Sequence, residues 1–154
     1  MEPLDLLKLI CAEFRLAPEQ FDSQRATTAD YIIALNRFLL DRLRDGVNAV
    51  LIIDEAQNLP PAALEQVRLL SNLETDTQKL LQIVLTGQPE LRETLARSEL
   101  RQLRQRIGIE HHVEPLQEHD ILPYLSHRIA EAGGDYEQNF SAGWPRSFFA
   151  LSGA

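Results

Sequence analysis

This sequence has almost no cysteine for disulfide bonds and no long apolar segment that could span a membrane. It has one cysteine, Cys11, so no disulfide bond can form within the chain and a reducing compartment is expected. No apolar run reaches the roughly 18 residues that a membrane-spanning helix needs, and the first residues lack the basic and then apolar order of a signal peptide. We therefore expect a cytoplasmic protein in which Cys11 is a buried thiol.

Lysine is also scarce, because the chain has only Lys8 and Lys79 beside thirteen arginines. Neither lysine follows a glycine, so the phosphate-binding loop G-x-x-x-x-G-K-[ST] is absent from these 154 residues. The net charge of -8 argues against a surface that binds nucleic acid over its whole extent, although a local basic patch would be compatible with it. The length and the 44% of hydrophobic residues suit one domain with an apolar core.

Hydrophobic spacing predicts helices that alternate with buried strands. Helices are expected over residues 3–16, from Thr27 or Thr28 to Gly46, from Pro60 through Leu73, and over about 90–105, 117–131 and 140–151, with strands over 48–54, 80–86 and 107–113. This order predicts an α/β fold with a parallel sheet and helices on both of its faces. Three strands are few for such a sheet, so we expect the opening helices to pack on strands that lie outside the chain.

An apolar strand that ends abruptly in two carboxylates is the most informative stretch of the sequence. Val50 to Ile53 reads VLII, and Asp54 and Glu55 follow directly. Open α/β sheets bind their ligands beyond the carboxyl ends of the strands. Asp54 is therefore a candidate partner of a nucleotide-bound Mg²⁺, held through water, and Glu55 is a candidate general base toward an attacking water. The alternative is that the two residues only end a strand and cap a turn.

Polar residues also follow the next buried strand. Thr86 and Gln88 stand at its carboxyl end, where a side chain could contact a terminal phosphate or orient the attacking water. The alternative is a turn without a ligand, which is the stronger reading for Thr86 and the weaker one for Gln88. Gln57 and Asn58, just past the carboxylates, could hydrogen-bond the same site or shape the turn.

Arginines are concentrated between residues 92 and 106. On a helix, such arginines interspersed with glutamates usually form a solvated face with i, i+4 pairs. Arg104 and Arg106 come just before a predicted strand, at an edge that a neighbouring subunit could approach, so each is a candidate arginine finger supplied in trans. A metal site built from histidines is not expected, because the adjacent His111 and His112 must point to opposite faces of a strand.

Four segments in this order together resemble one family of ATPases. They are residues 50–59 (VLIIDEAQNL), 65–75 (EQVRLLSNLET), 80–91 (LLQIVLTGQPEL) and 100–107 (LRQLRQRI). They are similar to the AAA+ P-loop ATPases of the general secretion pathway protein A type, often called ExeA-like. A weaker similarity extends from Leu4 to Ala154.

The resemblance implies a role for each candidate residue. Asp54 and Glu55 would form the Walker B element, Gln88 would occupy the sensor 1 position, and Arg106 or Arg104 would be the finger.

The implied fold is a P-loop NTPase-like three-layer sandwich with a parallel sheet, incomplete in this chain. Residues 1–114 would be the α/β core without its P-loop strand, and residues 115–154 would begin the helical lid. The family's Walker A loop would lie before Met1 and its sensor 2 element beyond Ala154.

The implied cofactors are ATP and Mg²⁺, and the implied activity is ATP hydrolysis that energises assembly in a bacterial secretion or pilus system. The implied partners are neighbouring subunits of the same ATPase and secretion-system or membrane-associated proteins, with inner-membrane association of the full-length protein. The alternatives are a DNA-binding transposition-helper ATPase, which the net charge disfavours, and a degenerate, non-catalytic interaction module. Because P-loop amides and the P-loop lysine hold most of the phosphate charge, the chain alone is expected to bind ATP weakly or not at all and to be inactive.

Overall fold

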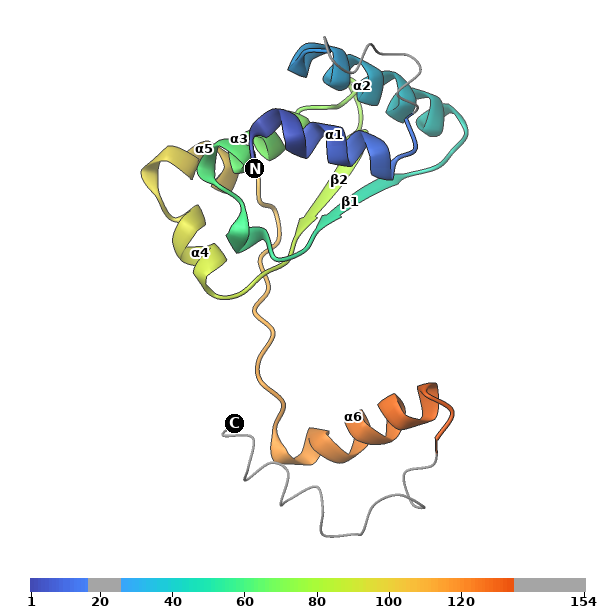
Figure 1. The fold of residues 1–154 in the computed structure, drawn as a ribbon, viewed down its shortest axis with the longest axis vertical. Helices are drawn as coiled ribbons and strands as arrows, with labels where there is room; N and C mark the ends of the chain where they lie inside the picture. Colours follow the sequence, from blue (N-terminus) through green and yellow to red (C-terminus); the bar gives the residue numbers. More distant parts are fainter. Residues whose placement is uncertain (17–25, 135–154) are drawn as a thin grey trace. The chain divides into compact units, whose positions relative to one another are not determined.

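A pair of parallel strands organises the amino-terminal part of the protein (Figure 1). The structure, a computed structural model, describes residues 1–16 and 26–134. The chain divides into two units, Met1–Ile109 and Glu110–Ala154. The first unit contains α1 (Pro3–Glu13), α2 (Thr28–Arg44), β1 (Ala49–Ile53), the 3-10 turn η2 (Ala56–Asn58), α3 (Pro61–Leu70), β2 (Leu81–Leu85), α4 (Glu90–Leu95), the 3-10 turn η3 (Ser98–Leu100) and α5 (Arg101–Arg104), and the second contains α6 (Glu118–Glu131).

The helices α1 and α2 begin and end at residues that favour helix termini. Pro3 occupies the first turn of α1, where its missing N–H leaves no intrahelical bond unmade. Before α2, the Thr27 backbone N–H and the Thr27 hydroxyl both donate to the Asp30 carboxylate, each at 2.8 Å, and these bonds lower the pKa of Asp30. Gly46 follows α2 with φ +73°, a conformation that glycine adopts without strain. The predicted starts and ends of both helices are confirmed to within a few residues.

The apolar faces of α1, α2 and α3 form the core of the first unit together with one face of the sheet. The buried residues of this core are Leu6, Leu7, Ile10, Cys11, Tyr31, Leu35, Leu39, Ala49, Ala63, Val67, Leu70, Leu80 and Leu81. Among them, Leu7 and Leu35 have no exposed surface. Cys11 is 3% exposed, which confirms the predicted buried thiol, and this burial raises its pKa to about 11.

The two strands pair in parallel from Ala49 opposite Leu81 to Ile53 opposite Leu85. Because side chains alternate along a strand, one face of the sheet contributes Ala49, Leu51 and Ile53 to the core. The other face leaves Ile52 65% exposed, together with Val50 and Val84. Within the described residues, helices of the first unit pack on one face of the sheet, as in an incomplete sandwich.

The helix expected over about 90–105 is broken. The chain leaves the helical conformation at Arg97, which has φ -63° and ψ 144° and precedes η3. Leu91 and Leu100 are nine residues apart, and a continuous helix at about 100° per residue would place them on opposite sides. The break instead lets both leucines be buried, with Leu100 and Leu103 packed against Leu64 of α3.

The strand expected over residues 107–113 is absent, although the alternation of apolar residues predicts it. This segment is irregular, and its Ile109 and Val113 side chains are 90% and 80% exposed. A strand is stable only when its backbone N–H and C=O groups pair with a neighbour. Among the residues described, β1 and β2 pair only with each other, so this segment forms no ladder.

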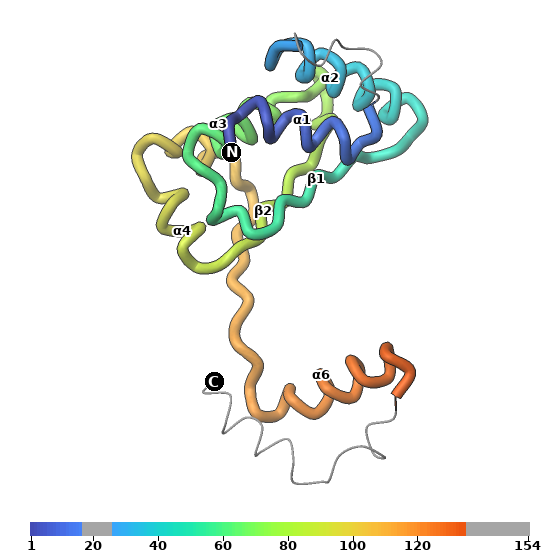
Figure 2. The backbone as a smooth tube through the Cα atoms, viewed as in Figure 1, coloured from blue at the N-terminus to red at the C-terminus, as the bar shows by residue number. Residues whose placement is uncertain are grey.

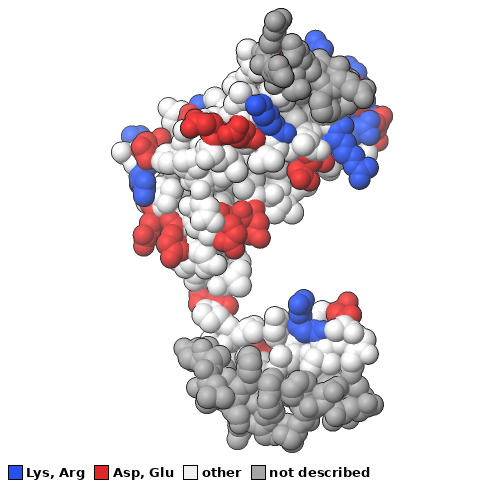
Figure 3. All heavy atoms as spheres, in the orientation of Figure 1, with Lys and Arg blue, Asp and Glu red and all other residues white. Residues whose placement is uncertain are grey.

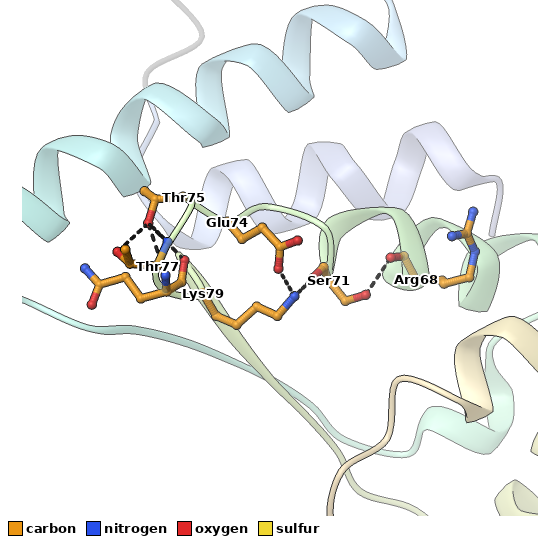
Figure 4. A network of polar contacts seen from close by, with 7 residues as sticks. Arg68, Ser71, Glu74, Thr75, Thr77 and Lys79 are labelled. Atoms are coloured by element: carbon orange, nitrogen blue, oxygen red, sulfur yellow. Dashed lines mark hydrogen bonds and ion pairs between the residues drawn. The ribbon is translucent and has the colours of Figure 1, made fainter.

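The turn between α3 and β2 is held by one of the two lysines (Figure 4). The Lys79 ammonium pairs with the Glu74 carboxylate and also donates to the Ser71 carbonyl at 3.3 Å. Lys79 is the main cause of the lowered pKa of Glu74, through both its hydrogen bond and its charge. This network lies in the turn just before β2.

In the second unit, α6 begins after Gln117, whose backbone N–H donates to the Asp120 carboxylate at 2.9 Å. Pro123 lies inside this helix. The helix expected over 140–151, which includes Trp144, lies outside the described residues. None of the helices in residues 1–16 and 26–134 is both long and apolar enough to cross a membrane.

Replacement of Leu35 by alanine is expected to lower the free energy of unfolding by about 2–5 kcal/mol, because it leaves a cavity between α1, α2 and the sheet. Urea unfolding followed by circular dichroism measures the change. Ile33 lies on the same helix but is 50% exposed, so Ile33→Ala is the matched control and should change the free energy of unfolding by much less. Equal losses in the two variants would contradict the assigned core.

Candidate functional site

The carboxyl ends of β1 and β2 lie side by side and are joined beyond the strands themselves (Figure 2). The Thr86 backbone N–H donates to the Ile53 carbonyl at 3.0 Å, and the Ala56 N–H donates to the Thr86 carbonyl at 2.9 Å. Parallel pairing places equivalent ends of neighbouring strands at one edge of a sheet. Asp54 and Thr86, 32 residues apart in the chain, therefore meet.

Asp54 is fixed by two hydrogen bonds to one of its oxygens. Its Oδ1 accepts from the Thr86 hydroxyl at 2.5 Å and from the Glu55 backbone N–H at 2.9 Å. These two bonds, that of Thr86 first, lower the pKa of Asp54 below its ordinary value, since they stabilise the ionised form. Within the described part of the chain, Oδ2 accepts no hydrogen bond. An ionised carboxylate thus presents one oxygen to a cation or to a water bound to it.

Glu55 follows in a backbone conformation that non-glycine residues rarely adopt. Its φ of 52° and ψ of 38° lie in the left-handed region, where a Cβ atom is disfavoured. Such strain concentrates at functional sites and persists where surrounding contacts hold it. Here the Glu55 carboxylate accepts a hydrogen bond from the Gln57 side-chain amide. The exposed carboxylate beside Asp54 is thereby given a fixed direction.

Gln88 contacts the candidate site through its backbone N–H. Its N–H donates to the Gln57 Oε1 at 3.1 Å, whereas its side chain makes no hydrogen bond to any residue that the structure describes. The Gln88 side chain is exposed and free to meet a ligand. The structure thus brings Asp54, Glu55, Thr86 and Gln88 together and adds Gln57, for which the sequence alone left two readings open.

The two predicted arginines lie elsewhere in the unit. Arg104 lines a cleft of about 480 Å³ formed by α4, η3 and α5, together with Arg97 and Arg101. Arg106 helps Lys79 lower the pKa of Glu74, which precedes β2 and so belongs to the opposite end of the strand from Thr86. Neither arginine makes a hydrogen bond or ion pair with the tip residues in the described part of the chain.

The side-chain oxygens at the carboxyl ends of β1 and β2 suit a metal cation that keeps most of its bound water molecules. Residues 1–16 and 26–134 contain no group of three or more His, Cys, Asp or Glu side chains that could hold a metal ion by themselves. Mg²⁺ is commonly bound through one or two carboxylates plus the phosphates of its nucleotide, with water completing the octahedron. Asp54, with a free oxygen and a lowered pKa, fits that role.

The model of the AAA domain family matches residues 1–95. This chain belongs to the AAA domain family. The match confirms the predicted family and the predicted fold class, since the mixed helices and the parallel pair β1–β2 are those of an incomplete α/β P-loop NTPase-like fold.

One curated relative of this AAA domain is similar over most of the chain. It is general secretion pathway protein A of Aeromonas hydrophila, which is 47% identical over 129 residues. These residues are 84% of this chain and 23% of that protein, so the chain spans about a quarter of its relative. No solved structure matches the chain significantly.

Thr86→Val is expected to raise the pKa of Asp54 back toward its ordinary value of 3.8, because valine cannot donate to the carboxylate. A pKa lowered by folding adds stability above the ordinary value, and this contribution is lost as pH falls through the folded value. The variant should therefore lose less stability on acidification than the wild type. A ¹³C NMR titration of the Asp54 carboxyl measures the shift directly.

Thr94→Val, on α4, is the matched control, because Thr94 makes no hydrogen bond to Asp54. It should leave the Asp54 titration unchanged. The same Asp54 titration in wild type and Thr86→Val would contradict the contact on which the site is built.

Proposed function

We propose that this AAA domain takes part in the binding and hydrolysis of ATP, with Asp54 and Glu55 as its Walker B pair and Gln88 at the sensor 1 position. The observation that carries the proposal is the junction of the two strand tips, where Asp54 Oδ1 accepts from the Thr86 hydroxyl while Glu55 stands beside it in a strained conformation. Packing alone requires neither an exposed carboxylate pair nor this backbone strain.

Each residue at the tips has a distinct chemical role in the proposal. Asp54 would hold Mg²⁺ through a water molecule, and the ion would supply charge that offsets the phosphates of ATP. Glu55 accepts the proton of the attacking water, and the Gln88 side chain orients that water or contacts the terminal phosphate. Thr86 orients the Asp54 carboxylate through its hydroxyl hydrogen bond and lies beside the nucleotide.

Arg104 and Arg106 act in trans in this proposal. Within the described residues neither makes a hydrogen bond or ion pair with the tip residues of its own unit, which supports a role toward the site of a neighbouring subunit. An arginine finger stabilises charge that develops on the phosphates in the transition state. The protein would accordingly work as a homo-oligomer whose sites are shared between subunits.

The similarity to general secretion pathway protein A supports a role in a bacterial secretion or pilus system, with secretion-system or membrane-associated proteins as partners. We further propose that residues 1–114 belong to the α/β core and that residues 115–154 begin a helical lid.

A DNA-loading ATPase is less well supported. On the face seen in Figure 3, Lys and Arg form small groups separated by Asp and Glu rather than one basic surface.

Purified residues 1–154 are expected to show little or no ATP binding by isothermal titration calorimetry, because the chain contains no P-loop motif. A chimera that carries this chain in place of the matching segment of general secretion pathway protein A should hydrolyse ATP. In that chimera, Glu55→Gln should lower kcat by about 10²–10⁴-fold, since the general base is lost. Release of inorganic phosphate measures the rate.

Asp45→Asn, an exposed carboxylate beyond the end of α2, is the matched control and should leave the rate unchanged. A chimera whose hydrolysis is indifferent to Glu55→Gln and Asp54→Asn would favour the non-catalytic interaction module. Saturable hydrolysis by residues 1–154 alone that disappears in Glu55→Gln would refute the expected dependence on a P-loop.

Arg104→Ala or Arg106→Ala should lower the kcat of the chimera by as much as about 10³–10⁵-fold for the arginine that acts as the finger. Mixing that inactive variant with the inactive Glu55→Gln variant should restore part of the activity. Some sites then combine an intact Glu55 with an intact arginine from the neighbour. A mixture of Glu55→Gln and Asp54→Asn, two lesions on the same side of the site, should not recover, and recovery there would contradict the shared site.

A further inference from the structure

One side chain at the strand tips contacts both halves of the candidate site. The Gln57 carboxamide oxygen accepts from the Gln88 backbone N–H at 3.1 Å, and its Nε2 donates to the Glu55 carboxylate. Gln57 follows β1 in the turn η2, whereas Gln88 follows β2, 31 residues later. A single planar amide therefore joins the proposed base to the loop that carries the proposed sensor.

The orientation of the Gln57 amide is dictated by its two partners. A backbone N–H can only donate and an ionised carboxylate can only accept, so the oxygen must face Gln88 and the nitrogen must face Glu55. The reversed amide would set a donor against a donor and an oxygen against a carboxylate. A carboxamide offers the acceptor and the donors that this bridge needs on one planar group.

Gly87 leaves the space in which this amide lies. A Cβ atom at position 87 would collide with Gln57 Oε1 and would come within 3.3 Å of the Ala56 backbone nitrogen. The turn after β2 therefore approaches η2 closely because residue 87 has no side chain. The main-chain bond from Ala56 to Thr86 holds the two turns at this separation.

We propose that Gln57 is a positioning residue that holds the Glu55 carboxylate in place and couples it to the Gly87–Gln88 turn. This inference rests on the proposed function, in which Glu55 is the base and Gln88 meets the phosphate or the water. Glu55 is exposed and its backbone is strained, so without the Gln57 bond its carboxylate would sample several directions. A displacement of Gln88 on ligand contact changes the Gln57 bond and with it the direction of Glu55.

Two NMR measurements on the full 154-residue chain test the bridge without any nucleotide. The first is hydrogen exchange of the Gln88 backbone amide. Gln57→Ala removes its acceptor and should speed exchange by roughly tenfold, which matches the net value of one exposed hydrogen bond. Gln57→Glu retains an acceptor oxygen and should keep the amide protected, so the conservative variant rescues the loss.

The second measurement compares the chemical shifts of the Gln57 side-chain amide protons between variants at one pH. Glu55→Ala removes the acceptor of this amide and should shift its resonances. Asp54→Asn should leave them in place, because Gln57 bonds Glu55 and not Asp54. Asn58→Ala, the neighbouring amide with no side-chain hydrogen bond to either partner, is the matched control and should alter neither measurement.

The role of the bridge is tested in the ATP-hydrolysing chimera, where Gln57→Ala should lower kcat roughly tenfold with little change in KM. Unchanged Gln88 exchange in Gln57→Ala, or Gln57 side-chain amide resonances that do not change in Glu55→Ala, would overturn the bridge. An intact bridge with unchanged kcat in Gln57→Ala would overturn its positioning role. Failure of the proposed function is distinct, since it appears as hydrolysis indifferent to Glu55→Gln while both NMR results stand.

Discussion

Parallel pairing of β1 with β2 is the constraint on which the rest of the described structure depends. The register from Ala49 opposite Leu81 to Ile53 opposite Leu85 ends both strands at the same level. Main-chain bonds then carry the pairing past the strands through Thr86 and Ala56. A shift of one residue would turn every side chain to the other face and would take Thr86 away from Asp54. The core and the candidate site are thus set by the same ladder.

The backbone of the candidate site is strained at Glu55, directly after β1. Glu55 adopts φ 52°, which costs a non-glycine residue about 1–3 kcal/mol in typical cases. That conformation turns the chain directly after Asp54, where β1 gives way to η2. The hydrogen bonds from Thr86 to Asp54 and from Gln57 to Glu55 fix the result. The strained conformation of Glu55 lowers stability locally, and the hydrogen bonds hold the Asp54 and Glu55 carboxylates in defined positions.

The exposed sheet face and the irregular segment 107–113 have a common physical cause. Both carry the hydrophobic pattern of buried structure, yet each needs a neighbour that the described residues do not provide. Val50, Ile52 and Val84 lack a covering layer, and Ile109 and Val113 lack a strand with which to pair. Membership of the AAA domain family agrees with this picture, since the two strands are part of a sheet that is larger in that fold class.

Most of the elements could be predicted because their causes are local. Thr27 with Asp30, Pro3, Gly46 and the apolar spacing of α1, α2 and α3 act over a few residues, so the sequence by itself determined these helices, the two strands and the family to which they belong. The meeting of Asp54 with Thr86 was expected only as a shared edge. Tertiary structure alone decided the break at Arg97, the loss of the 107–113 strand and the bridge through Gln57. Each depends on which surfaces meet across the chain, which residue types and spacing along one segment do not specify.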